Sequence, residues 1–97
     1  MSQSGIDQNG EAWAVYGEMT FPTVNRLLSA FRAKKLNDNA CIAIDLSRVT
    51  RADSAGLALL IEWMGLARQN GAQIEFRNMP GQMREIARVT EVDQLLS

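Results

Sequence analysis

The sequence predicts one α/β domain over residues 1–97, with a mixed sheet of four to five strands and three to four helices packed on it. Short apolar segments with strand-like alternation are separated by longer segments with helical spacing, in the order β-β-α-β-α-β-α. Strands separated by helices need crossover connections. Part of the sheet must therefore be parallel, and helices must cover at least one of its faces.

The first two strands are predicted at the N-terminus. In "EAWAVYGEM" apolar residues alternate with polar or small ones, which predicts a strand over residues 11–17. The pair Asn9-Gly10 is typical of a hairpin turn, so residues 4–8 are expected to form a short partner strand.

A helix is predicted next, from the Thr20–Pro22 region to about Leu36. Thr20 is expected to cap its start, because a threonine oxygen accepts backbone N–H bonds and proline is tolerated in a first helical turn. Its apolar face is formed by residues at helical spacing, namely Val24, Leu27, Leu28 and Phe31.

The apolar run "ACIAIDL" predicts a buried central strand that ends at Asp45. Within it, Cys41 is expected to be a small buried hydrophobic residue and not a reactive thiol. "SRVTRAD", residues 47–53, is expected to be a loop.

The second half is predicted to contain a helix over residues 54–69, a strand in "AQIEFRN" and a final helix in "PGQMREIARVTEVDQLL". Asn70-Gly71 suits the end of the first of these helices. The final helix has Met83, Ile86 and Ala87 at helical spacing, a break near Thr90, and a last turn that carries Val92, Leu95 and Leu96.

Composition excludes several classes of function. The chain has ten Lys and Arg residues, eleven Asp and Glu residues and a formal net charge of -1, so a nucleic-acid partner is not expected. No histidine is present, which removes the Ser-His-Asp and Cys-His catalytic pairs and most zinc sites. We therefore expect no catalytic residue, no metal and no cofactor.

The N-terminal stretch lacks the basic and apolar parts of a signal peptide. No apolar run approaches the roughly 18 residues that a membrane span requires. These features predict a cytoplasmic protein without direct membrane insertion.

The helix over residues 54–69 carries more apolar surface than one sheet can cover. At about 100° per residue its apolar side chains sweep roughly 220°, whereas packing on a sheet needs a stripe of little more than about 100°. Either neighbouring helices flank it, or the edge with Leu59, Trp63 and Leu66 is a docking surface for another protein.

The segment "RADSAGL", residues 51–57, precedes and begins this helix. Ser54 is not a plausible nucleophile, because histidine is absent and Asp53 is a poor base for a hydroxyl. A phosphate-binding loop is excluded, because the G-x-x-x-x-G-K-[ST] pattern does not occur. Asp53 or Ser54 is expected to cap the helix, and Gly56 to permit a close approach to its first turn.

These residues carry a resemblance to a known family. The run "IAIDLSRVTRADSAGLALLIEWMGLARQNG", with "GEM" at the end of the earlier strand, resembles the STAS domains, the family of anti-sigma-factor antagonists, over nearly the whole chain. The resemblance implies a mixed sheet with helices packed on it, and a protein that binds a partner and catalyses no reaction.

Two branches of the family differ at the helix start. In the antagonists the motif is Asp-Ser-Ser-Gly, and a kinase phosphorylates the serine before glycine, where this chain has Ala55. Ser54 is then only an off-position acceptor. "DLSRVTRADSAGLALL" is more similar to the MlaB-like, or toluene-tolerance, STAS subunits of the bacterial phospholipid-transporting ABC system.

That branch implies a small cytoplasmic subunit, peripheral to the inner membrane through its complex, that docks on the transporter ATPase and serves outer-membrane lipid asymmetry. The residues expected to bind the partner are Arg51, Asp53, Ser54 and Ala55, with Leu59 and Trp63 as apolar support. The alternatives are an anti-sigma-factor antagonist and a lipid carrier with its own cavity. A homodimer is left open.

Overall fold

The computed structural model describes residues 4–9, 12–34, 36 and 39–89. Within them one four-stranded sheet has the order β1-β2-β3-β4. The elements follow the predicted order and are β1 (Gly5–Asn9), β2 (Ala12–Met19), α1 (Val24–Arg32), β3 (Cys41–Ala52), α2 (Ser54–Gln69), β4 (Gln73–Arg77) and α3 (Gly81–Val89). β1 pairs with β2 antiparallel, while β2–β3 and β3–β4 are parallel, so the predicted mixed sheet is confirmed.

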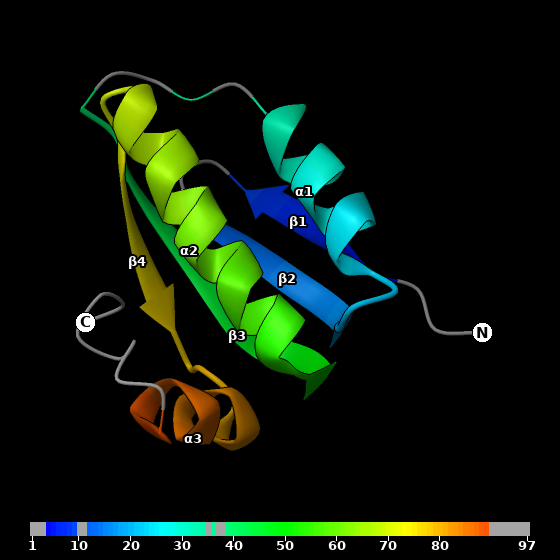
Figure 1. Cartoon of the computed structure of the whole chain (residues 1–97). Helices are drawn as coiled ribbons and strands as arrows, with labels where there is room; N and C mark the ends of the chain where they lie inside the picture. The colour runs from blue at the N-terminus through cyan, green and yellow to red at the C-terminus, as the bar shows by residue number, and fades with distance from the viewer. Residues whose placement is uncertain (1–3, 10–11, 35, 37–38, 90–97) are drawn as a thin grey trace.

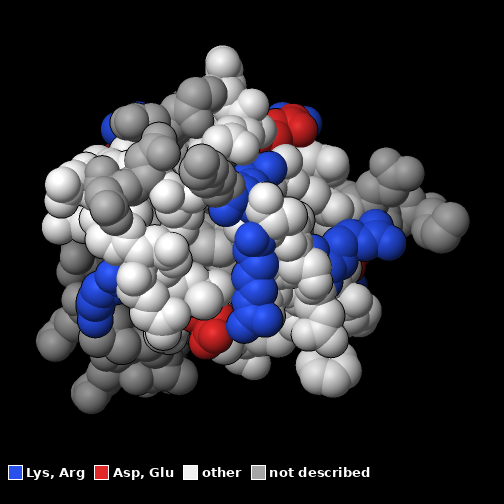
Figure 2. Space-filling model, turned by 90° about the horizontal axis from the view of Figure 1, so that it is seen from above, with Lys and Arg blue, Asp and Glu red and all other residues white. Residues whose placement is uncertain are grey.

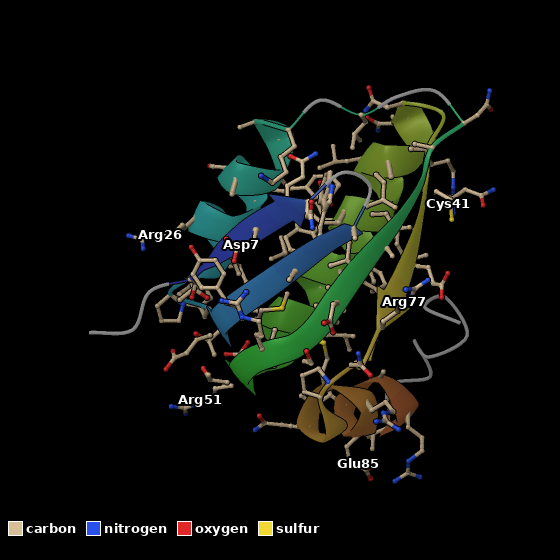
Figure 3. All side chains as sticks on the ribbon, turned by 180° about the vertical axis from the view of Figure 1, so that it is seen from behind. Asp7, Arg26, Cys41, Arg51, Arg77 and Glu85 are labelled. Carbon is tan, nitrogen blue, oxygen red and sulfur yellow. The ribbon has the colours of Figure 1, made fainter. Side chains whose placement is uncertain are left out.

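Two layers make up the molecule, as Figure 1 shows: α1 and α2 lie side by side on one face of the sheet, and α3 lies near the end of β3. Seen from behind in Figure 3, the other face of the sheet is open in the described part of the chain. The strands alternate accordingly. Ile42, Ile44 and Leu46 of β3 face the helices and are buried, whereas Asp45 and Ser47 face solvent.

This alternation also places Cys41. Cys41 is the first residue of β3 and lies on the same face of the sheet as Asp45 and Ser47. It is exposed, so the expectation that it is a buried hydrophobic residue is wrong.

α1 begins at Val24, later than predicted, and its N-cap is Thr23 and not Thr20. The reason is a tight turn over residues 20–23, in which Thr20 O accepts the N–H groups of Thr23 and Val24 at 2.8 and 3.0 Å. The Thr23 hydroxyl donates to Glu18 O at 2.8 Å and accepts from Thr20 N at 2.9 Å. Local side-chain bonds of this kind compete with helix formation.

The predicted loop over residues 47–53 is wrong, because β3 continues to Ala52. Its pairing with β2 shifts register twice, between Ala14 and Tyr16 and between Gly17 and Glu18. At each shift β3 has one more residue than β2, which is the arrangement of a β-bulge. A bulge interrupts the two-residue alternation, so "SRVTRA" does not read as a strand in the sequence.

α2 has the predicted bounds and packs against both the sheet and the neighbouring α1. Phe31 of α1 stacks on Trp63 of α2 with ring centroids 5.1 Å apart, and Trp13 of β2 meets Phe31 edge-on at 5.4 Å. Leu59 and Trp63 are 5% and 0% exposed. Flanking by a neighbouring helix is therefore the explanation that the structure supports for these two side chains.

The predicted break at Thr90 and the last turn with Val92, Leu95 and Leu96 lie outside the described residues. None of the helices in the described part of the chain combines the length and the hydrophobicity that a membrane-spanning segment needs.

Candidate functional site

The candidate site lies where β2 and β3 end together. Met19 and Ala52 are register partners at the last residues of these parallel strands. The two segments that follow, the turn over residues 20–23 and the start of α2, are therefore neighbours in space although they are about thirty residues apart in the sequence. A backbone bond from Asp53 N to Met19 O, at 3.3 Å, joins them.

Asp53 is the N-cap of α2, so of the two residues that the sequence offers for the cap, Asp53 and Ser54, the structure has the first. Its Oδ1 accepts the backbone N–H groups of Ala55 at 2.9 Å and Gly56 at 3.2 Å, which satisfies two of the free donors in the first helical turn. Its Oδ2 accepts the backbone N–H of Phe21 at 3.2 Å. One carboxylate thus holds both the helix start and the turn that follows β2.

Gly56 lies against the end of β2. A Cβ at this position would collide with the carbonyl oxygen of Met19. The close approach expected for Gly56 is therefore made within the chain itself, to the backbone of a neighbouring strand.

Ser54 and Arg51 are exposed, and Ala55 is half-buried. Since Asp53 supplies the capping oxygen, the Ser54 hydroxyl is not needed for the cap and faces solvent beside the positive end of the helix. α3 reaches this region through Gln82, whose Oε1 accepts the backbone N–H of Ala52 at 3.3 Å. The predicted partner-binding residues Arg51, Asp53, Ser54 and Ala55 therefore lie together at one end of the molecule.

Leu59 and Trp63, predicted to contribute to partner binding, do not lie on this surface. Both belong to the core, so the docking edge, one of the two alternatives that the helical wheel leaves open, is not exposed at these positions. The wheel cannot distinguish an apolar face that meets α1 from one that meets another protein. Their contribution to the site is to hold α2 in place from beneath.

Phe21 was missed by the sequence analysis. Its side chain is 79% exposed, and it lies in the turn that Asp53 holds. It belongs to no periodic apolar pattern, because it precedes α1 and follows β2. The signal that could have identified it is a large aromatic residue beside Pro22 in a short connection between two elements.

The carboxylate of Asp53 is engaged by the backbone around it. The carboxylate nearest to Ser54 is committed to three backbone N–H groups, so it is not oriented as a base for that hydroxyl. The described residues also contain no group of three or more Cys, Asp or Glu side chains that could hold a metal ion.

A polar network occupies the open face of the sheet, away from Ser54. Asp45 accepts hydrogen bonds from the Asn78 side chain at 3.0 Å and from Ser47 N at 2.9 Å, and these bonds hold the pKa of Asp45 below its ordinary value of 3.8. On the same face Arg48 pairs with Asp7 at 2.9 Å.

Two open grooves lie near the other end of α2. One, of about 430 Å³, is lined by Met64, Arg68, Gly71, Ala72, Gln73 and Ile74. The other, of about 260 Å³, lies between the ends of α1 and α2 and is lined by Phe31, Arg32, Lys34, Leu36, Leu66 and Asn70. Figure 2 views this end and shows Lys and Arg side chains spread over the surface, with Asp or Glu side chains beside some of them.

Comparison with known proteins agrees with this architecture. The family described as "Mlab, STAS domain" matches residues 4–97. The intermembrane phospholipid transport system binding protein MlaB of Escherichia coli (strain K12) is 29% identical over 82 residues, which are 84% of this chain and 81% of that protein.

Two solved structures share the fold. The crystal structure of an anti-sigma factor antagonist from Mycobacterium paratuberculosis has a TM-score of 0.68 at 22% identity, covering 99% of this chain and 83% of that one. A crystal structure of Mglu has a TM-score of 0.59 at 18% identity over 79% of this chain but only 19% of that one. At these identities the likeness concerns the fold alone.

The match over residues 4–97, the confirmed order of strands and helices and the capped Asp-Ser-Ala-Gly helix start agree with one another. This chain is a member of the MlaB-type STAS domain family.

Proposed function

We propose that this chain is a non-enzymatic STAS subunit that binds the ATPase of a phospholipid-transporting ABC system and regulates or stabilises it. The contact is the surface formed by Arg51, Asp53, Ser54 and Ala55 at the start of α2. In this proposal the chain acts on the cytoplasmic side of the inner membrane, where its partner holds it, and the transporter serves outer-membrane lipid asymmetry.

The observation that carries the proposal is the exposed Ser54 hydroxyl on a helix start that Asp53 holds rigidly. A hydroxyl that does not cap the helix and faces solvent is free to bond a partner. This one lies beside the positive end of a helix. Similarity to a protein named as part of a phospholipid transport system supports the choice of partner.

The geometry favours a binding subunit over a lipid carrier. A lipid carrier needs a cavity that encloses acyl chains away from water, and such sites are largely apolar. The two grooves of the described chain are open and are lined in part by charged or polar side chains.

The experiment is capture of the purified ATPase subunit of the organism's own phospholipid-transport ABC system by the immobilised chain. Wild type is expected to retain the ATPase, and Ser54→Ala to weaken its retention by about fivefold or more, as for a central interface residue. Ser29→Ala, which changes an exposed serine on α1, is the matched control and is expected to bind as wild type. Retention by Ser54→Ala at the wild-type level contradicts the proposed contact.

A further inference from the structure

We infer that Phe21 is the apolar anchor of this interface, and that it enters an apolar pocket of the ATPase bordered by carboxylates. The inference rests on the proposed function and adds to it a second contact segment and the chemistry of the partner surface. It starts from an aromatic side chain that the fold leaves outside the core.

Phe21 and Val89 are the exposed large hydrophobic side chains among the described residues, at 79% and 72%. A single exposed apolar side chain is ordinary on a protein surface. Phe21 differs because its backbone N–H is bonded to Asp53, the residue before Ser54, so the turn that carries the exposed ring adjoins the start of α2.

The turn that carries Phe21 is held before any partner arrives. Asp53 Oδ2 accepts its backbone N–H, and the flanking Thr20 and Thr23 are bonded to one another and, through the Thr23 hydroxyl, to Glu18 O. Pro22, which follows Phe21, further restricts the backbone. An anchor presented on a fixed backbone loses little conformational entropy on binding, which is the condition under which an aromatic residue contributes most.

Two arginines define the charge that the partner should carry. Arg26 and Arg51 are exposed, and Figure 3 shows both projecting outward on the same side of the molecule, Arg26 from the first part of α1 and Arg51 from the end of β3. Neither takes part in the ion pairs formed between described residues, which are Arg48–Asp7, Arg77–Glu75 and Arg88–Glu85.

Arg26 lies in the first part of α1, the helix that follows the Phe21 turn. Arg51 lies two residues before Asp53, the residue that holds this turn. Positive side chains around an apolar anchor complement an apolar pocket with an acidic rim. The partner surface is therefore a hydrophobic depression with Asp or Glu side chains at its edge, and not a uniformly apolar patch.

The test measures the dissociation constant of the ATPase subunit for Phe21→Ala and, as the matched control, Val89→Ala. Phe21→Ala is expected to weaken binding at least about tenfold, and Val89→Ala to leave it unchanged. Phe21→Leu is expected to restore part of the affinity because it keeps apolar bulk. Thermal unfolding checks that each variant is folded. All three are expected to fold, because the side chains of Phe21 and Val89 do not belong to the core.

Charge reversal tests the acidic rim. Arg26→Glu and Arg51→Glu are expected to slow association and to reduce its dependence on salt, whereas Arg68→Glu at the other end of α2 is expected to do neither. If the association rates of Arg26→Glu and Arg51→Glu equal that of wild type, the partner pocket has no acidic rim.

The outcomes separate the inference from the proposed function. If wild type binds, Ser54→Ala weakens binding and Phe21→Ala binds as wild type, the anchor is wrong while the proposed function stands. If wild type does not bind, both fail. Two other outcomes also overturn the inference, provided that the affinity of Phe21→Ala for the ATPase is unchanged. They are loss of self-association and loss of sedimentation with vesicles of anionic phospholipid, and each assigns the ring to a different interaction.

Discussion

The Asp53 carboxylate accepts the backbone N–H of Phe21 across 3.2 Å, joining the turn after β2 to the start of α2. The other oxygen of the same carboxylate caps α2. The helix start and the turn that carries Phe21 are therefore held by one side chain, and the strand pair that ends at Met19 and Ala52 brings the two segments together.

Asp53→Ala is expected to destabilise the fold by about 1–3 kcal/mol, because it removes the helix cap and also frees the N–H of Phe21. Ser54→Ala is expected to stay within about 0.5 kcal/mol of wild type, because Ser54 is exposed and does not cap. Urea unfolding measures both. Equal destabilisation by the two variants would show that Ser54 contributes to the cap.

Gly56→Ala and Gly65→Ala lie in the same helix and are expected to change stability in opposite directions. A Cβ at position 56 meets the Met19 carbonyl, which predicts a loss of about 1–3 kcal/mol. No atom lies within 4 Å of a Cβ built at position 65, so alanine there is expected to add about 0.5–1 kcal/mol through helix propensity. Melting temperatures compare the pair, and a stabilised Gly56→Ala variant contradicts the packing described for Met19.

Acid sensitivity is expected to involve Asp45. Because hydrogen bonds from Asn78 and Ser47 lower its pKa in the folded state, its contribution to stability is complete above the unfolded value and is lost as the pH falls through the folded value. Asp45→Asn should therefore lose less stability than wild type when the pH falls from 7 through the unfolded and then the folded pKa of Asp45. Glu62→Gln, on the exposed side of α2, is the control, because it also replaces one carboxylate by an amide of the same shape. Parallel pH profiles for wild type and Asp45→Asn contradict this role.

Incubation with a serine kinase that acts on an anti-sigma-factor antagonist is expected to leave wild type unmodified. Family resemblance places the acceptor at position 55, where alanine has no hydroxyl. Ala55→Ser supplies one on a residue whose backbone N–H is already bonded to Asp53, and is expected to accept phosphate. Mass spectrometry locates the modification. Stoichiometric phosphate on wild type that disappears in Ser54→Ala would favour the antagonist function over the proposed one.

Local patterns were sufficient for most of the elements. The helical spacing after Asp53, and the cap and glycine that flank the helix, predicted the bounds of α2. β3 was predicted too short, since its two register shifts break the alternation on which strand prediction depends. α1 was predicted to begin too early, because Thr20 resembles a helix cap. In the structure Thr23 is the N-cap residue, and its hydroxyl bonds Glu18 O within the turn that precedes the helix.

The sequence by itself determined the order of elements, a helix cap at Asp53 or Ser54 and the family resemblance, because each depends on neighbouring residues. Only the tertiary structure decided which apolar residues are core and which are surface. Trp63 is fully buried against Phe31, while Phe21 is exposed in the turn that Asp53 holds. Apolar character is the same in both cases. Burial depends on what the folded chain places against each side chain, and no local pattern contains that information.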